Sequence, residues 1–184
     1  MAKIIVPLAA GFEEIEAITI IDVSRRAGID VAVCSLDENL DVLGAHNITL
    51  KADMTIDALV STKYEMIVLP GGAKGTENLA SNKSIQALLK EFKKKDKLIG
   101  AICAAPYALH KAGVLNKEYT CYPSYENKIR KEGYHPVRAI VVDDNVITSR
   151  GPGTAMCFAL EIVKILAGEK KFEEVRKGLL VEFC

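Results

Sequence analysis

The sequence lacks an excess of charge of either sign. Its 184 residues contain 24 Lys and Arg against 24 Asp and Glu, so the formal net charge at pH 7 is zero. Neither the phosphates of a nucleic acid nor an anionic lipid surface attracts a neutral protein. We therefore expect neither nucleic acid nor a membrane as the main partner.

Long hydrophobic segments are also absent. The first apolar run, residues 4–12, is too short to span a bilayer and meets Glu13 and Glu14 directly, which a secretory signal does not tolerate. A later uncharged stretch, residues 98–109, is also too short and contains Pro106. We expect a cytoplasmic protein.

The cysteines lack metal-site and disulfide-framework spacing. The five cysteines are odd in number and form no C-x-x-C motif, which predicts neither a disulfide framework nor a zinc site. No G-x-G-x-x-G is present, and in residues 71–76 a glycine follows Lys74 where a phosphate loop needs Ser or Thr. We predict no metal and no cofactor.

What the chain does have is the composition of an ordinary globular protein, with 49% hydrophobic and 26% charged residues. A chain of this mass can bury roughly 70% of its unfolded surface. We find no linker, repeat or low-complexity stretch, and predict one domain over residues 1–184.

Strand and helix patterns alternate along this domain. Short β-branched or apolar runs predict strands, amphipathic runs ending at Gly predict helices, and Asp143 to Asn145 predicts a hairpin turn. The predicted strands are 3–9, 29–36, 48–50, 66–69, 98–102, 139–142 and 146–148, and the predicted helices are 13–27, 84–95, 105–112, 154–166 (capped by Thr154) and 171–177. This order predicts an α/β fold with a mostly parallel sheet, helices on both faces and one late hairpin.

Ligands of open α/β sheets bind beyond the carboxyl ends of the strands. Four strand ends carry unusual residues, which we expect to converge at one site: 11–16, 70–72, 103–106 and 149–153.

Cys103 lies where a predicted strand turns sharply into a helix. The amides of a helix N-terminus favour a thiolate, so Cys103 is a candidate nucleophile with a lowered pKa. The alternative is a buried structural cysteine, the class in which we place Cys34, Cys121 and Cys157.

Glu16 lies within an apolar helix, where burial would raise the pKa of its carboxyl. A protonated Glu16 donates a hydrogen bond to a thiolate, whereas an ionised one repels it. Glu13 and Glu14 are either further site residues or a solvated acidic first turn, which suits the helix dipole.

Gly71 and Gly72 permit close backbone approach, so their N–H groups either form an oxyanion hole or simply shape a turn after Pro70. No histidine is an obvious base: His110 lies ~10 Å along the helix from Cys103, and His46 and His135 lie in loops. The residues alone predict a reactive cysteine without a catalytic triad.

Five motifs together resemble the ThiJ/PfpI superfamily, and specifically its parkinsonism-associated deglycase branch. They are GFEEIEA (11–17), RRAG (25–28), LPGG (69–72), AICAAP (101–106) and TSRGPGT (148–154). The resemblance implies a flavodoxin-like three-layer sandwich that dimerises, with Cys103 at a nucleophile elbow.

The resemblance also implies roles for single residues. Cys103 would be the oxidisable nucleophile and Glu16 its protonated partner, while Gly72, the amide of Ala104 and Arg150 would form an anion or oxyanion site. Asp22 would contribute across the dimer. His46 stands where this branch often has an arginine that reaches the partner's site, so it is either a titratable group entering that site or an exposed loop residue.

Two positions depart from related branches. Ala104 replaces a histidine found after the nucleophile in protease-like branches, which argues against a peptidase. Tyr122 replaces a histidine before Pro123, and a phenol with a pKa near 10 is a poor base at neutral pH.

Two functions follow from the resemblance. The first is an enzyme that acts on small aldehydes or early glycation adducts, as a glyoxalase or deglycase. The second is a redox sensor or redox-regulated chaperone, in which Cys103 is oxidised to the sulfinate without turnover.

Overall fold

A seven-stranded central sheet has the order β5-β2-β1-β6-β7-β9-β8 in the computed structural model, which describes residues 1–184. Every neighbouring pair is parallel except β8 and β9, which form the predicted antiparallel hairpin. The strands are β1 (Lys3–Leu8), β2 (Asp30–Ser35), β5 (Met54–Thr55), β6 (Met66–Leu69), β7 (Leu98–Ile102), β8 (Ile140–Asp143) and β9 (Val146–Ser149).

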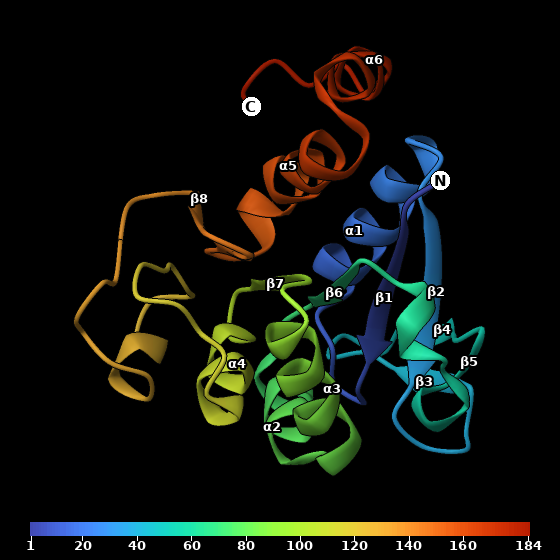
Figure 1. Cartoon of the computed structure of the whole chain (residues 1–184), viewed down its shortest axis with the longest axis vertical. Helices are drawn as coiled ribbons and strands as arrows, with labels where there is room; N and C mark the ends of the chain where they lie inside the picture. Colours follow the sequence, from blue (N-terminus) through green and yellow to red (C-terminus); the bar gives the residue numbers. More distant parts are fainter.

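Helices cover both faces of this sheet (Figure 1). One face packs against α1 (Glu14–Arg26), α5 (Ala155–Ala167) and α6 (Glu169–Gly178), the other against α2 (Ala73–Ser81), α3 (Lys83–Lys94) and α4 (Pro106–Ala112). Successive strand residues point to opposite faces, so Ile4 and Val6 join the first core while Ile5 joins the second. The predicted three-layer α/β sandwich is confirmed.

Three segments differ from the sequence prediction, and one of them is the short edge strand β5, which was not predicted. The segment predicted as one short strand forms an antiparallel pair, β3 (Asp41–Leu43) with β4 (Thr49–Lys51), outside the main sheet. Helix α2 was not predicted, because its sequence is polar and contains Gly75. A Cβ at Gly75 would lie 2.9 Å from both Phe12 and the carbonyl oxygen of Gly11, so only glycine lets α2 pack so closely.

Short 3-10 turns complete the chain at Ile56–Ala58, Ser61–Lys63, Tyr125–Asn127 and Pro152–Thr154. Thr154 precedes α5 as predicted, but its side chain does not cap that helix. The hydroxyl instead donates to the carbonyl oxygen of Gly151 and accepts from its N–H, which closes the turn before α5.

The expectation that the cysteines form no disulfide is wrong for one pair. Cys157 on α5 and Cys184 are disulfide-bonded, whereas Cys34, Cys103 and Cys121 are free. The two residues are 27 positions apart, and α6 reverses the chain so that their Cα atoms lie 5.3 Å apart. This return is a tertiary feature, which cysteine spacing alone does not reveal.

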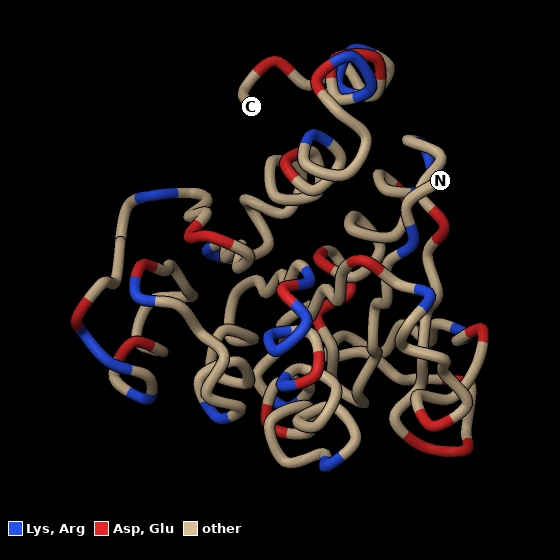
Figure 2. The backbone as a smooth tube through the Cα atoms, in the orientation of Figure 1, with Lys and Arg blue, Asp and Glu red and all other residues tan.

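No helix combines the length and the apolar character that crossing a membrane requires. Lys and Arg are interspersed with Asp and Glu, and neither sign dominates the view in Figure 2. This interspersion agrees with the zero net charge.

Candidate active site

The turn at Cys103 is as sharp as the sequence predicts. Cys103 links β7 to α4 with a φ of 66°, a conformation that non-glycine residues seldom adopt. Its N–H donates to the carbonyl oxygen of Ser149 (2.9 Å), and its carbonyl oxygen accepts from the N–H of Tyr122 (2.8 Å). These bonds hold the strained residue between β9 and the loop that carries Tyr122.

Glu16 is fully buried and lies against Cys103. Its Oε2 accepts a hydrogen bond from the N–H of Gly71 (2.7 Å), and its Oε1 is buried without a partner of ordinary hydrogen-bond geometry. A Cβ at Gly71 would lie 2.6 Å from Cβ of Cys103 and 2.7 Å from Oε2 of Glu16. The carboxyl and the thiol therefore flank a position with no room for a methyl group, and one carboxyl oxygen is free to carry a proton.

Burial raises the pKa of the Glu16 carboxyl to about 7, although the N–H of Gly71 and the hydrogen bond with Cys103 lower it. This agrees with the predicted proton on Glu16.

The predicted lowering of the Cys103 pKa is not found. Burial raises the pKa of this thiol, and the charge of an ionised Glu16 raises it further. Hydrogen bonds from the N–H groups of Gly72 and Ala104 act in the opposite direction. The effect of desolvation on the pKa of Cys103 is larger than that of these two N–H groups. A thiolate at Cys103 therefore requires a protonated Glu16, because an ionised Glu16 repels the negative sulfur.

The roles of the two glycines can now be separated. The N–H groups of Gly72 and Ala104 act on the sulfur by lowering the pKa of the thiol, and their role in an anion site stays a prediction. The N–H of Gly71 is occupied by Glu16 and is not available to an oxyanion, which corrects its predicted role. Gly72 has a φ of 94°, and a Cβ there would lie 2.4 Å from the carbonyl oxygen of Gly11.

The four predicted strand ends do meet. Besides the contacts of Glu16 and Ser149, the N–H of Glu13 donates to the carbonyl oxygen of Gly71 (3.0 Å). Segments 11–16, 70–72, 103–106 and 149–153 are thereby joined at one edge of the sheet.

Glu14 is buried rather than solvated, which excludes the acidic-turn alternative for this residue. Its Oε1 accepts from the backbone N–H of His46 (2.6 Å), and its Oε2 lies 2.9 Å from Nδ1 of the same histidine. The His46 side chain remains 67% exposed and also lies 3.7 Å from Oε2 of Glu13. The hydrogen bond with Glu14 raises the pKa of His46.

Arg150 lines a hollow of about 260 Å³ beside Tyr122, Pro123 and the glycines that follow it. Its Nε is buried without a hydrogen-bond partner, and its guanidinium forms no ion pair. Tyr122, which lines this hollow, also donates its N–H to the carbonyl oxygen of Cys103. An unpaired guanidinium is a group that can hold an anion, and the anion-binding role of Arg150 stays a prediction.

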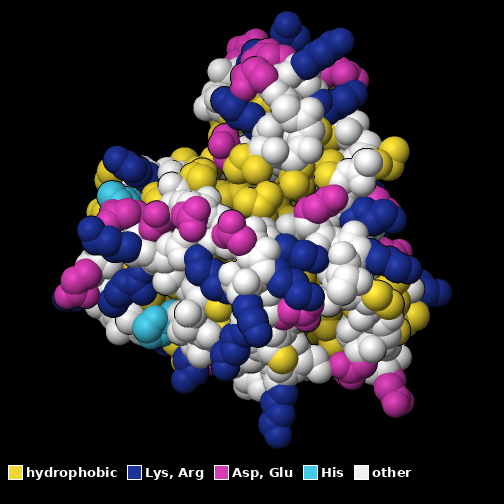
Figure 3. Space-filling model, in the orientation of Figure 1, with side chains coloured by type: hydrophobic (Ala, Val, Ile, Leu, Met, Phe, Trp, Pro, Cys, Tyr) yellow, Lys and Arg dark blue, Asp and Glu magenta, His cyan; other side chains and the backbone are white.

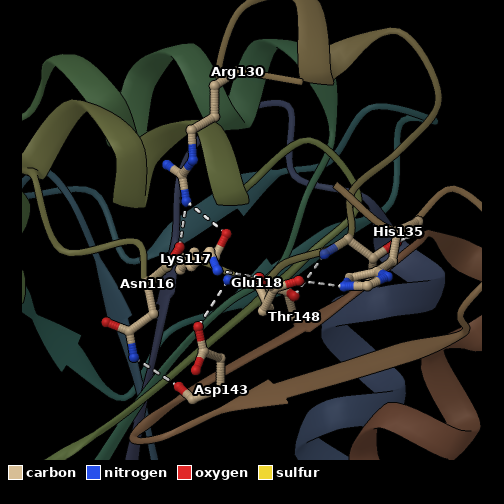
Figure 4. Close-up of polar contacts among 8 residues, drawn as sticks. Asn116, Lys117, Glu118, Arg130, His135, Asp143 and Thr148 are labelled. Atoms are coloured by element: carbon tan, nitrogen blue, oxygen red, sulfur yellow. Dashed lines mark hydrogen bonds and ion pairs between the residues drawn. The ribbon is translucent and has the colours of Figure 1, made fainter. Parts of the chain in front are cut away.

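The loop that carries Tyr122 is fastened at both ends (Figure 4). The N–H of Glu118 donates to Asp143 (2.8 Å), and the Glu118 carboxylate lies 2.7 Å from Nε2 of His135. The N–H of Thr120 donates to the Thr148 hydroxyl (2.9 Å) on β9. His135 is thus a partner of Glu118 and not a base for Cys103.

One group beside the site was missed by the sequence analysis. Lys128 pairs with Glu77 of α2 (2.9 Å) and lies 5.0 Å from the ring centre of Tyr125 and 5.6 Å from that of Tyr107. Burial raises the pKa of Tyr125, and the nearby Cys103 contributes. The only sequence signal was the concentration of tyrosines in residues 119–134.

Asp22 is the predicted site residue that lies apart from this group. It is exposed on α1 and forms an ion pair with Arg26 (2.7 Å), without a contact to Cys103 in the same chain.

Three features define the class of this protein. Glu16 is a buried carboxyl, it lies against a cysteine of positive φ, and both are at the carboxyl ends of the parallel strands. The chain is therefore a three-layer α/β protein with a cysteine-centred site. Within this class, the chain belongs to the DJ-1/PfpI family, whose model matches residues 2–165. The resemblance inferred from the five motifs is confirmed.

Relatives match nearly the whole chain. Protein dj-1beta of Drosophila melanogaster is 41% identical over 181 residues, which cover 97% of each chain. The crystal structure of that protein superimposes with a TM-score of 0.95 over 99% of both chains. Glutathione-independent glyoxalase DJ-1 of Schizosaccharomyces pombe is 32% identical over 188 residues, covering 97% of this chain and 98% of that one. Protein DJ-1 homolog B of Arabidopsis thaliana is 40% identical, and there the match covers 97% of this chain but only 41% of the longer relative.

Proposed function

We propose that this chain is a cysteine-dependent protein of the cytoplasm that acts on small reactive carbonyl compounds, such as methylglyoxal or early glycation adducts. Cys103 is the nucleophile and Glu16 moves the proton. The observation that carries the proposal is the fully buried Glu16 carboxyl, one oxygen unpartnered, beside a strained cysteine whose sulfur receives two backbone N–H groups. The name of the fission yeast relative, a glutathione-independent glyoxalase, supports the reaction class.

The site supplies what a conversion of methylglyoxal to lactate needs. The Cys103 thiolate adds to the aldehyde carbon, and the resulting alkoxide takes a proton to give a hemithioacetal. The proton on that carbon moves to the neighbouring carbonyl carbon through an enediol, which turns the adduct into a thioester. Water hydrolyses the thioester, so one methylglyoxal and one water give one lactic acid and restore the thiol.

Each group has a stated part in this sequence. Glu16 exchanges the proton because its pKa of about 7 lets it carry or release one at neutral pH. The N–H groups of Gly72 and Ala104 stabilise negative charge at the reacting centre. Arg150 lines the hollow beside Tyr122, where an anionic group of a larger substrate would bind.

The test is lactate formation from methylglyoxal in a stopped assay. Cys103→Ser should lower kcat/KM by roughly 10³-fold or more, because it removes the nucleophile. Cys121→Ser is the matched control, since Cys121 is fully buried in a separate small apolar cluster. Equal turnover by wild type and Cys103→Ser would refute the assignment.

A redox sensor or redox-regulated chaperone is the second candidate, and the lack of a base favours it. His46 is bonded to Glu14, His135 to Glu118, and Tyr122 stands where a relay histidine is expected. In this role a peroxide oxidises Cys103 to the sulfenate and a second peroxide to the sulfinate. Sulfinate formation without lactate formation would select this candidate over the enzyme.

We further propose that the chain functions as a homodimer through α1 and the β3–β4 pair. Four large apolar side chains are exposed on this surface: Ile15 (58%), Ile18 (42%), Leu43 (49%) and Ile48 (49%). Such a cluster favours burial against a second copy. His46 and Asp22 are close in sequence to these residues, and we propose that in the dimer each approaches the partner's cysteine site.

A further inference from the structure

The disulfide between Cys157 and Cys184 joins the first turns of α5 to the segment that follows α6. Cys157 is partly buried and Cys184 is exposed. Both sulfurs therefore lie near the surface, where small oxidants and reductants can act. The other two cysteines besides Cys103, namely Cys34 and Cys121, are fully buried and unpaired.

The last three residues of this segment, 182–184, have no polar tether besides the disulfide, whereas the residues before them are bonded to α6. The N–H of Val181 donates to the carbonyl oxygen of Arg176 (3.1 Å), and its own carbonyl oxygen accepts from Nη1 of Arg176 (2.9 Å). Beyond Val181, residues 182–184 take part in no hydrogen bond and no ion pair. Phe183 is 72% exposed, so apolar packing contributes little to holding the segment.

Beneath the segment lies a hollow of about 380 Å³ between β8 and helices α5 and α6. Its apolar walls include Ile140 and Phe172, and residues Phe183 and Cys184 form part of its lining. Figure 3 shows hydrophobic side chains gathered in the hollow under α6. Since β8 is the outermost strand of the sheet, this hollow borders an open sheet edge.

We propose that Cys157 and Cys184 form a second redox site, independent of Cys103, that switches between a dithiol and a disulfide and so fastens residues 182–184 over this hollow. The cytoplasm reduces most structural disulfides, so a surface pair there responds to the redox state of its surroundings. The inference does not rest on carbonyl chemistry at Cys103.

The reaction balances with a hydroperoxide as oxidant. One thiolate attacks the peroxide to give a sulfenic acid and an alcohol, or water when the oxidant is hydrogen peroxide. The second thiol displaces water from that sulfenic acid and forms the disulfide. A dithiol reductant reverses the change by thiol–disulfide exchange and is itself oxidised to a disulfide.

The first test maps the bond. Trypsin cleaves after Arg150, Lys164 and Lys177, so the disulfide joins peptide 151–164 to peptide 178–184. The linked peptide should vanish after treatment with dithiothreitol and return after stoichiometric hydrogen peroxide, in wild type and in Cys103→Ser alike. Free, alkylated Cys157 and Cys184 after peroxide treatment would overturn the proposal, as would a bond that forms only when Cys103 is present.

The second test measures the order of the segment. The ¹H–¹⁵N heteronuclear NOE of residues 182–184 should be high in the oxidised protein and fall to values of a mobile chain after reduction. Cys184→Ser should give the mobile values under both conditions, and its exposed position makes it safe for the fold. Equal NOE values in the oxidised and reduced wild type would show that the bond does not fasten the segment.

Discussion

At the scale of single residues, Glu16 should make the stability of the fold depend on pH. In the folded protein its pKa is raised from 4.5 to about 7, because the carboxyl is buried. Between these values the folded state binds more protons than the unfolded state, so the free energy of unfolding falls as the pH rises. The loss attributable to Glu16 is roughly 3 kcal/mol, complete slightly above pH 7.

Glu16→Gln should remove this dependence, because an amide does not titrate. Urea unfolding of both proteins at several pH values between 4.5 and 8 measures it, and the difference between the two curves isolates Glu16 from His46 and the other titrating groups. The variant should gain stability relative to wild type as the pH rises. Parallel curves would mean that folding does not raise the pKa of Glu16.

A second prediction at this scale concerns hydrogen-bond donation to the sulfur. Glu16→Gln retains a donor next to Cys103, whereas Glu16→Leu does not. A hydrogen bond to a charged group contributes ~1.5–3 kcal/mol, so Gln should keep sulfinate formation under peroxide roughly tenfold or more faster than Leu. Mass spectrometry of the Cys103 peptide measures the rates.

Glu13→Gln serves as the control for that comparison. Glu13 is a neighbouring carboxylate whose side chain is 13% exposed and whose removal leaves the Glu16 carboxyl in place. Its charge is the smallest of the contributions to the pKa of Glu16, so Glu13→Gln should change the oxidation rate far less than Glu16→Leu does. The same rate in Glu16→Gln and Glu16→Leu would leave the carboxyl without a role.

The sequence predicted Cys103 and Glu16 because their positions in the strand–helix order are sufficient to bring them together. It did not predict that the N–H of Gly71 donates to Glu16, or that Glu14 is buried against His46. Both facts depend on contacts across 55 and 32 residues of sequence, which no local pattern encodes. The pKa of Cys103 could not be predicted for the same reason, because its burial and one of the two backbone N–H groups that act on it come from segments distant in sequence.

At the scale of elements, the turn between β6 and α2 passes between the side chains of Cys103 and Glu16, with Gly71 at the closest point. Gly71→Ala would place a Cβ 2.6 Å from Cβ of Cys103 and 2.9 Å from the carbonyl oxygen of Ile102. Overpacking of this kind costs ~1–3 kcal/mol and displaces the cysteine from Glu16. We expect a lower urea midpoint and slower oxidation of Cys103.

Gly153→Ala is the matched control, because it also lies at a strand end of the site. Nothing lies within 4 Å of a Cβ built there, and its φ is outside the left-handed range. It should leave both stability and oxidation unchanged. Wild-type behaviour of Gly71→Ala would contradict the packing argument.

Elements with a regular apolar pattern could be predicted from the sequence. Elements whose position depends on packing against distant segments could not. Helix α3 shows its buried face as Ile85, Leu88, Leu89 and Phe92 in the sequence itself. Helix α2 has no such face, and its Gly75 is explained only by the backbone of residues 11–12 against which it packs. The partner of Cys157 is likewise revealed only by the return of the chain after α6.

At the scale of the whole molecule, the proposed dimer rests on the exposed apolar residues of α1 and the β3–β4 pair. Ile18→Asp would place a charge in the middle of this surface, and the cost of burying an unpaired carboxylate should convert the dimer to a monomer. Light scattering measures the mass. Val137→Asp, which alters a residue 84% exposed elsewhere, should leave the dimer intact. A wild type that is monomeric at all concentrations would exclude this assembly.

The last prediction is that His46 links the proposed dimer to pH. Its hydrogen bond with Glu14 raises its pKa above the ordinary 6.5, so the imidazolium persists to higher pH and is lost as the pH rises through the raised value. If the cation reaches the partner's site, Cys103 alkylation by iodoacetamide should show an inflection above pH 6.5 in the wild-type dimer.

Two variants test this inflection. His46→Ala should abolish it, and Glu14→Gln should move it down toward 6.5, because the carboxylate that stabilises the imidazolium is gone. The inflection of Glu16, at about 7, stays in both variants and must be fitted separately. Superimposable profiles of wild type and His46→Ala, with both proteins dimeric, would make His46 an exposed residue without a part in the site.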